Sequence, residues 1–159
     1  MTDELQAVEK WAGALLAQLA PAARRKVMLD IARELRRSQQ TRIAAQREPD
    51  GTAYTPRKVK AQKSGKKLRG KRGRIKRAAM FAKLRTARYM QVEATPTGLA
   101  IGFAGRVARI ARVHQFGEVD RVSSGGPEVR YPARVLLGLT DADRGLIRDQ
   151  LVQHITRGL

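Results

Sequence analysis

The chain is divided by residues 57–77, which read RKVKAQKSGKKLRGKRGRIKR. More than half of these residues are lysine or arginine, and no aspartate or glutamate occurs between Asp50 and Glu93. The few large apolar residues of the segment are too scattered to form a buried face, so burial cannot offset the entropy that ordering would cost. Because like charges repel at this density, we expect an extended segment that becomes ordered only against a negative partner.

The basic segment dominates the charge of the whole chain. The 159 residues carry a formal net charge of +19, whereas residues 1–50 and 118–159 each contain both signs. A field of this sign attracts polyanions such as nucleic acid, anionic lipid or an acidic protein surface. The length suits one domain with a modest core, which we divide into a helical hairpin (1–48), a basic extended segment (51–77) and an α+β half (78–159).

Composition also narrows the possible classes of protein. There is no cysteine, so the chain has no disulfide framework and no thiolate metal site. No apolar run approaches the roughly 18 residues needed to span a membrane. The N-terminus begins with the acidic sequence Met1-Thr2-Asp3-Glu4, which is not typical of a signal peptide.

The first 48 residues have the periodicity of two amphipathic helices. The apolar positions are Leu5, Val8, Ala12, Leu15 and Leu19 in a first helix of about five turns, and Val27, Met28, Ile31 and Leu35 in the second. Pro21 ends the first helix and is tolerated in the first turn of the second. The short break predicts a helical hairpin, closed by the turn Pro49-Asp50-Gly51.

Residues 78–103 begin the second half and favour mixed structure. Residues 78–85 have a helical composition and predict a short helix. Two alternating runs, 90–94 and 99–103, flank a Pro- and Gly-containing turn at 95–98 and predict an antiparallel hairpin.

The last third of the chain predicts one more hairpin and two more helices. Residues 106–115 have apolar residues at helical spacing and predict a short helix ended by Gly117; a strand is the open alternative, because valine and isoleucine are abundant. Residues 119–131 predict a hairpin with a Gly-rich tip. Thr140 and Asp143 resemble a capping box that starts a final helix. One face of that helix is expected to carry Leu146, Ile147, Leu151, Val152 and Ile155.

The predicted fold is therefore α+β, with an N-terminal helical hairpin, a basic loop, a small antiparallel sheet and a C-terminal helix. We find no catalytic constellation in it. Residues 65–72 contain Gly-x-x-x-x-Gly-Lys, but Arg72 replaces the Ser or Thr of a phosphate loop and no apolar strand precedes it. His114 and His154 lack the partners of a metal site, and residues 123–124 lack the context of a serine nucleophile. The sequence predicts a protein that is not an enzyme and has no metal and no cofactor.

The basic segment is the best candidate for a binding site. Dense lysine and arginine suit contact with phosphates without sequence preference, and the segment has no aromatic residue to stack on bases. Acidic residues of a neighbouring subunit are the alternative partner. The residues predicted to contact DNA or an acidic partner are Arg57, Lys58, Lys60, Lys63, Lys66, Lys67, Arg69, Lys71, Arg72, Arg74, Lys76 and Arg77.

Residues 106–117, RVARIARVHQFG, resemble the phage virion morphogenesis proteins, the tail completion proteins of tailed phages. The similarity continues in the same order through other stretches and spans nearly the whole chain. These stretches are PDG (49–51), YTPRK (54–58), MFAKLR (80–85), VRYPAR (129–134) and LLGL (136–139).

The resemblance implies a structural virion protein that acts late in tail assembly, at the end of the tail that joins the head. Related neck and tail-terminator proteins form rings, commonly hexamers, so the expected partners are further copies of the chain, other tail and neck proteins and packaged DNA. The expected location is the virion, after assembly in the host cytoplasm. A nucleic-acid-binding protein that uses the basic segment on the phosphate backbone is the alternative.

A ring subunit needs surfaces that become buried only on assembly. The residues predicted to form the subunit interface are Arg106, Arg109, Arg112, Arg121, Arg130 and Tyr131. We expect residues 114–117, HQFG, to be structural instead, with the ring of His114 fixing the turn before the hairpin.

Overall fold

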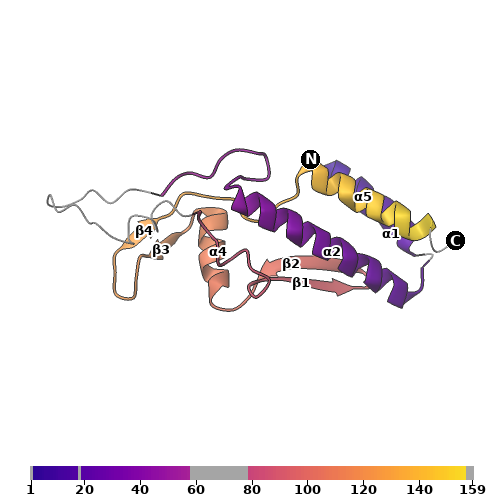
Figure 1. Cartoon of the computed structure of the whole chain (residues 1–159), viewed down its shortest axis with the longest axis horizontal. Coiled ribbons are helices and arrows are strands. Elements are labelled where there is room, and N and C mark those ends of the chain that lie inside the picture. Colours follow the sequence, from indigo (N-terminus) through magenta and orange to yellow (C-terminus); the bar gives the residue numbers. More distant parts are fainter. Residues whose placement is uncertain (1, 18, 58–78, 157–159) are drawn as a thin grey trace.

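The structure is a computed structural model that describes residues 2–17, 19–57 and 79–156. Its elements confirm the predicted α+β class (Figure 1). They are α1 (Thr2–Leu16), α2 (Pro21–Ala44), β1 (Met90–Thr95), β2 (Gly98–Phe103), α4 (Val107–Phe116), β3 (Val119–Arg121), β4 (Glu128–Arg130) and α5 (Asp141–Thr156).

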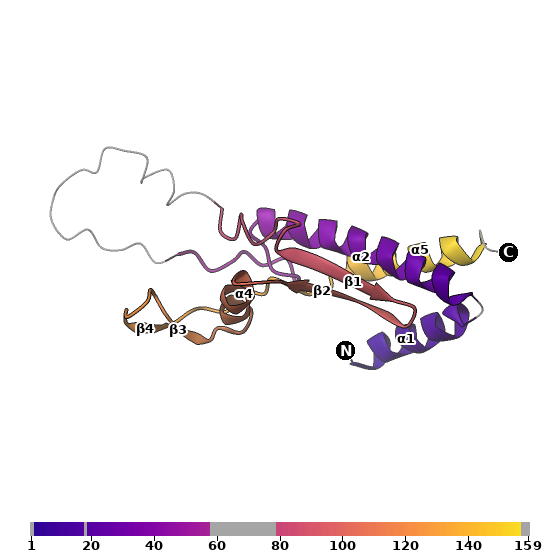
Figure 2. The ribbon, with the colours of Figure 1, turned by 90° about the horizontal axis from the view of Figure 1, so that it is seen from below.

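Helix α2 is the centre of the fold. The β1–β2 hairpin lies along one side of it and α5 along another, as Figures 1 and 2 show together. Val27, Ile31 and Leu35 recur every four residues, so they share one face, and they are buried with Leu151 of α5. The second predicted helix and the helix at the C-terminus are thus confirmed.

The predicted β1–β2 hairpin is also confirmed. Its register runs from Met90 opposite Phe103 to Thr95 opposite Gly98, which leaves a two-residue turn. The side chains of β1 alternate between the core side and the solvent side, as expected of a sheet with one buried face.

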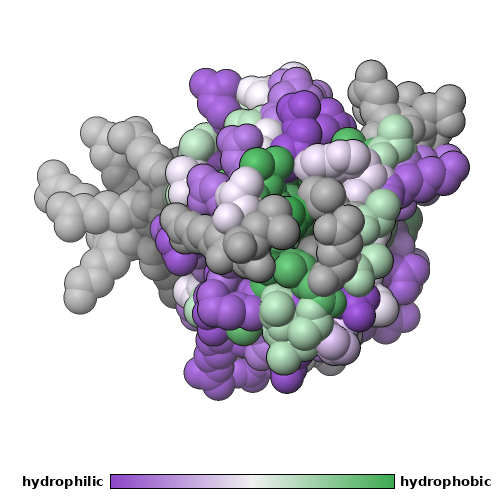
Figure 3. Space-filling view, turned by 90° about the vertical axis from the view of Figure 1, so that its right-hand side faces the viewer, coloured by the Kyte–Doolittle hydropathy of each residue, from purple (hydrophilic) through white to green (hydrophobic). Residues whose placement is uncertain are grey.

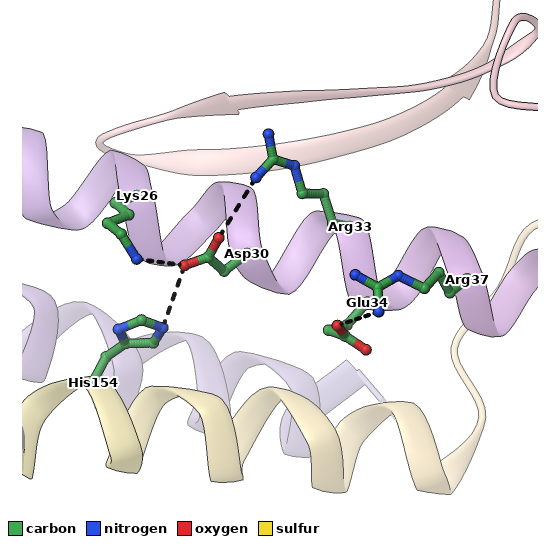
Figure 4. A network of polar contacts seen from close by, with 6 residues as sticks. All are labelled: Lys26, Asp30, Arg33, Glu34, Arg37 and His154. Carbon is green, nitrogen blue, oxygen red and sulfur yellow. Dashed lines mark hydrogen bonds and ion pairs between the residues drawn. The ribbon is translucent and has the colours of Figure 1, made fainter.

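Polar contacts also link α5 to α2 (Figure 4). Asp30 of α2 accepts a hydrogen bond from Lys26 at 2.9 Å and lies 3.8 Å from Arg33. The Nε2 atom of His154 on α5 lies 3.7 Å from the same carboxylate. Because exposed ion pairs contribute only about 0–1 kcal/mol, the apolar contacts around Leu151 are the main hold on α5.

Two of the predicted helix ends are confirmed in detail. Gly117 ends α4 in the left-handed region, with φ +67°. The helix predicted over residues 106–115 is present as Val107–Phe116, so the strand alternative is wrong. At the start of α5, the Asp143 N–H donates to Thr140 Oγ1 at 3.1 Å, and the Thr140 N–H donates to Asp143 Oδ2 at 2.9 Å. The predicted capping box is therefore present.

Three local predictions are wrong. The short helix expected over 78–85 is a series of turns over residues 80–89, because Phe81 has φ +65°, outside the helical region. Helix α1 ends at Leu16 and is shorter than the five turns predicted. Val152 is exposed instead of sharing the buried face of α5.

Across the described ranges, no helix is long and apolar enough to cross a membrane.

Candidate interaction surface

A partly buried aromatic cluster joins described residues on the two sides of the basic segment. Tyr54 and Phe81, on either side of residues 58–78, meet edge to face with ring centroids 5.8 Å apart. The Phe81 ring meets His114 at 4.9 Å, and His114 meets Tyr131 at 5.1 Å, again edge to face. Such pairs add about 0.5–1.5 kcal/mol each beyond their burial. Both sides of the segment are thus fastened to α4 and to the chain that follows β4.

Arg134 fastens the residues that immediately precede Arg57. Its side chain is only 3% exposed; Nε donates to Thr55 O at 2.7 Å and Nη2 donates to Pro56 O at 3.3 Å. Its Nη1 lies 3.1 Å from Nδ1 of His114, and its backbone N–H donates to His114 O at 2.7 Å. The basic segment therefore starts at a fixed point on the fold.

His114 is suited to accept this hydrogen bond because it stays neutral. Burial, together with the charges of Arg134 and Arg57, lowers the pKa of His114 to about 4. In the neutral ring, Nδ1 can accept from Arg134 while Nε2 carries the proton. The prediction that the His114 ring has a structural role is consistent with these contacts.

Gln46 holds Met80, which lies on the other side of the segment. The Met80 N–H donates to Gln46 Oε1 at 2.7 Å, and Gln46 Nε2 donates back to Met80 O at 3.0 Å. The same nitrogen donates to Ile43 O near the end of α2, at 2.7 Å. The described residues on the two sides of the segment, up to Arg57 and from Ala79, therefore lie beside one cluster.

Most of the predicted contact residues lie outside the described part of the chain. Of that set, the structure describes Arg57, which is exposed. The other eleven lie within residues 58–78, so their predicted contacts stay predictions.

Three of the arginines predicted at the subunit interface are exposed but paired within the chain. Arg109 pairs with Asp120 of β3. The Arg112 Nε lies 3.0 Å from a Glu118 oxygen, and Arg121 and Glu128 pair across the β3–β4 hairpin at 3.4 Å. The hydrogen bonds from the Arg121 backbone N–H and the Arg109 side chain lower the pKa of Asp120. The pairs of Arg109 and Arg112 link the hairpin to α4, and exposed pairs of this kind contribute about 0–1 kcal/mol each.

The other three predicted interface residues differ in role. Arg106 is exposed just before α4, with no acidic partner among the described residues. Arg130 donates to Gly117 O at 3.4 Å. Tyr131 is half-buried against His114, so it also serves the fold.

The sequence interpretation missed the apolar character of this region. Seven large apolar side chains are exposed among the described residues, and five of them lie on α4 and the β3–β4 hairpin. Those five are Ile110, Phe116, Val119, Val122 and Val129. Phe116 was expected to be structural as part of HQFG, but it is 69% exposed. We call this region, residues 106–130, the α4–hairpin surface. Because Val119 pairs with Arg130 and Val129 pairs with Asp120, the two valines lie on opposite faces of the hairpin. Phe116 is the most exposed residue of the set, and exposure of so large an apolar ring suits a site of association.

The described residues offer no site for a metal ion, since no three His, Asp or Glu side chains among them lie close enough together. Ser123, one of the two tip serines, accepts the Gly126 N–H on its carbonyl at 2.9 Å, which is a turn contact. The chemistry that the arrangement supports is association through charge and apolar contact.

Comparisons with known proteins point the same way. The family model described as the phage virion morphogenesis family matches residues 3–156. Over 156 residues the chain is 38% identical to tail completion protein S of Escherichia phage P2, an alignment that covers 98% of this chain and 99% of that protein. No solved structure matches the chain.

Proposed function

This chain belongs to the phage virion morphogenesis family, and we propose that it completes the phage tail as one subunit of a homo-oligomeric ring. The ring, expected to be a hexamer, would sit at the neck, where the tail joins the head, after assembly in the host cytoplasm. A family of this kind and a relative named for tail completion support a structural role without catalysis.

The observation that carries the proposal is the α4–hairpin surface. A monomer in water gains nothing from exposing the ring of Phe116, which is 69% exposed, whereas a ring subunit would bury it against the next subunit. The ion pairs of Arg109 with Asp120 and of Arg112 with Glu118 already link the hairpin to α4 before any partner arrives, each with a contribution of about 0–1 kcal/mol. A surface shaped in advance loses less entropy on binding.

The anchored basic segment supports a second contact in the same particle. The described residues on its two sides lie beside α4, because Phe81 and Arg134 both contact His114 and Arg134 also binds Thr55. A ring around a channel would bring several copies of the segment together, so the local positive charge would multiply. We propose that it contacts packaged DNA or an acidic face of a neighbouring tail or neck protein.

The test is a phage that lacks the gene for this chain, complemented in trans. Wild-type chain should restore joined, infectious particles, whereas particles without it should accumulate as separate heads and tails in electron micrographs. Normal yields of joined particles without the chain would overturn the proposal.

The alternative is a separate nucleic-acid-binding protein, favoured only by the charge of the basic segment. It predicts a monomer with DNA affinity that falls steeply with salt, and no defect in tails when the gene is missing. Light scattering of the purified chain and DNA titrations at two salt concentrations separate the two functions.

A further inference from the structure

A second apolar surface lies at the other end of the molecule from the β3–β4 hairpin (Figures 1 and 2). Helices α1, α2 and α5 and the turn between β1 and β2 line a groove of about 650 Å³. Its walls include Val8, Met28, Leu99, Leu139 and Ile147. Figure 3 faces this end of the molecule, where apolar residues gather in the middle within a polar rim.

Helix α1 leaves this groove unfilled because the residues it turns toward the groove include small ones. Ala12 and Gly13 both line the groove, and a Cβ built on Gly13 meets no atom within 4 Å. Protein interiors are normally packed without such space. An apolar space of this size, open to solvent, can accept apolar side chains from outside.

The α4–hairpin surface offers a side chain of the required kind. Phe116 is the most exposed of the large apolar residues described, and a phenylalanine ring buries roughly 150–250 Å² when it enters such a site. It lies at the end of α4 that leads into the β3–β4 hairpin, away from α1 and α5.

The charges of the two surfaces are also complementary. Glu9 is the one ionisable residue among the described residues that line the groove. On the other surface, Arg106 is exposed and has no acidic partner within the described ranges. Arg106 precedes α4 and Phe116 ends it, about 15 Å further along the helix axis, so attraction between Arg106 and Glu9 would favour the approach of the two surfaces from beside the apolar contact.

We infer that Phe116 of one subunit enters the α1 groove of the next copy of this chain, so that subunits associate head to tail. The two surfaces differ and lie at opposite ends, so the contact is heterologous and closes into a ring when the rotation between subunits permits. The inference rests on the ring proposed above and names the contact that builds it.

Substitution of Phe116 tests the apolar anchor. Phe116→Ser removes an exposed side chain and should leave the fold intact, while it raises the dissociation constant of the oligomer about 30-fold or more. Val152→Ser is the matched control, because Val152 is exposed on α5 but does not line the groove. Analytical ultracentrifugation over a concentration series measures both.

Cross-linking tests the direction of the contact. The chain has no cysteine, so Val119→Cys, at an exposed position three residues after Phe116, and Thr97→Cys, in the groove wall, each provide a single thiol. A short bismaleimide should link the two variants to each other in a mixture and should link neither variant to itself.

The outcomes separate this inference from the proposed function. An oligomer that is unchanged by Phe116→Ser, or cross-links only between like positions, would overturn the head-to-tail contact and leave the role in tail completion standing. A wild-type chain that stays monomeric at every concentration would overturn the contact and the ring together. Failure of the role itself would appear only in the complementation experiment.

Discussion

Replacement of Arg134 by methionine should remove the hold on the basic segment and keep most of the apolar volume of the side chain. The variant loses the donors to Thr55 O and Pro56 O and the contact with His114. A buried acceptor left unpaired costs about 1–3 kcal/mol. Thr55 and Pro56 are themselves exposed, so water can hydrogen-bond to these oxygens and reduce this cost. The variant also no longer buries the guanidinium charge, which offsets a further part of the lost stability. We expect a net loss of about 2 kcal/mol of unfolding free energy.

Urea unfolding followed by circular dichroism measures this loss. With a slope of about 1–3 kcal/mol per molar, Arg134→Met should lower the midpoint by roughly 1 M. Arg130→Met is the control, because Arg130 is exposed and makes one long bond of 3.4 Å; a surface change of that kind stays within about 0.5 kcal/mol. If both variants unfold at the same urea concentration, the argument for Arg134 as an anchor is refuted.

The same variant has a second readout at His114. Burial is the main cause of its low pKa, and the charge of Arg134 lowers the pKa further. Arg134→Met should therefore raise the pKa of His114 above about 4, while burial keeps it below 6.5. Titration of the imidazole by NMR measures the change, and an identical pKa in both proteins would contradict the contact.

Acid should destabilise the fold through His114. The side chain titrates near 6.5 when unfolded and at about 4 when folded, so its contribution is complete above pH 6.5 and is lost as the pH falls toward 4. Between pH 7.5 and 5 the unfolding free energy of the wild type, measured in urea, should fall by about 1–2 kcal/mol more than that of His114→Gln. Equal losses in the two proteins would contradict this. Gly117→Ala should lower the thermal midpoint by the equivalent of about 1–3 kcal/mol, because φ is +67° and the new Cβ would lie 3.0 Å from Ala133 N; Gly145→Ala, in open space within α5, should not lower it. Serine at five positions of the basic segment should leave the circular dichroism spectrum unchanged. It should weaken binding to DNA or to an acidic partner, as measured by fluorescence anisotropy. Loss of folding would contradict the claim that the fold does not depend on the segment. Those positions are Lys66, Lys67, Arg69, Lys71 and Arg72.

Periodic stretches of the sequence predicted the regular elements well. The spacing of Val27, Ile31 and Leu35 is enough to predict α2, because a helix must bury one face. The capping box at Thr140 and the glycine after α4 also act over a few residues. Where the interactions that form an element lie within a few residues of each other, the sequence alone is enough to predict that element.

The turns over residues 80–89 could not be predicted in the same way. Their composition is helical, but packing of the Phe81 ring between Tyr54 and His114 accompanies a left-handed backbone at Phe81. The partners lie 27 and 33 positions away in the chain, so this tertiary contact outweighs local propensity.

Buried polar side chains were missed for the same reason. Arg42 donates to the carbonyl oxygens of Val135 and Leu136 at 3.2 and 2.7 Å, and Gln115 accepts the N–H groups of residues 136 and 137 at 2.8 and 3.0 Å. A sequence shows these residues as ordinary polar positions on helices. The sequence holds one hint. The apolar run VLLGL, residues 135–139, is too short to form an ordinary helix, so its backbone groups could have been expected to need side-chain partners.

This extended run, residues 135–139, also connects the two surfaces on which the proposed ring depends. Gln39 of α2 binds both backbone groups of Gly138, while Gln115 of α4 binds the backbone of Leu136 and Leu137. The run follows the hairpin and then lines the groove through Leu137 and Leu139. A head-to-tail ring closes only if the angle between the two contact surfaces is the same in every subunit. Side chains that pin the backbone between α2 and α4 fix that angle, which is a reason for a small protein to bury amides and arginine where apolar residues would pack at lower cost.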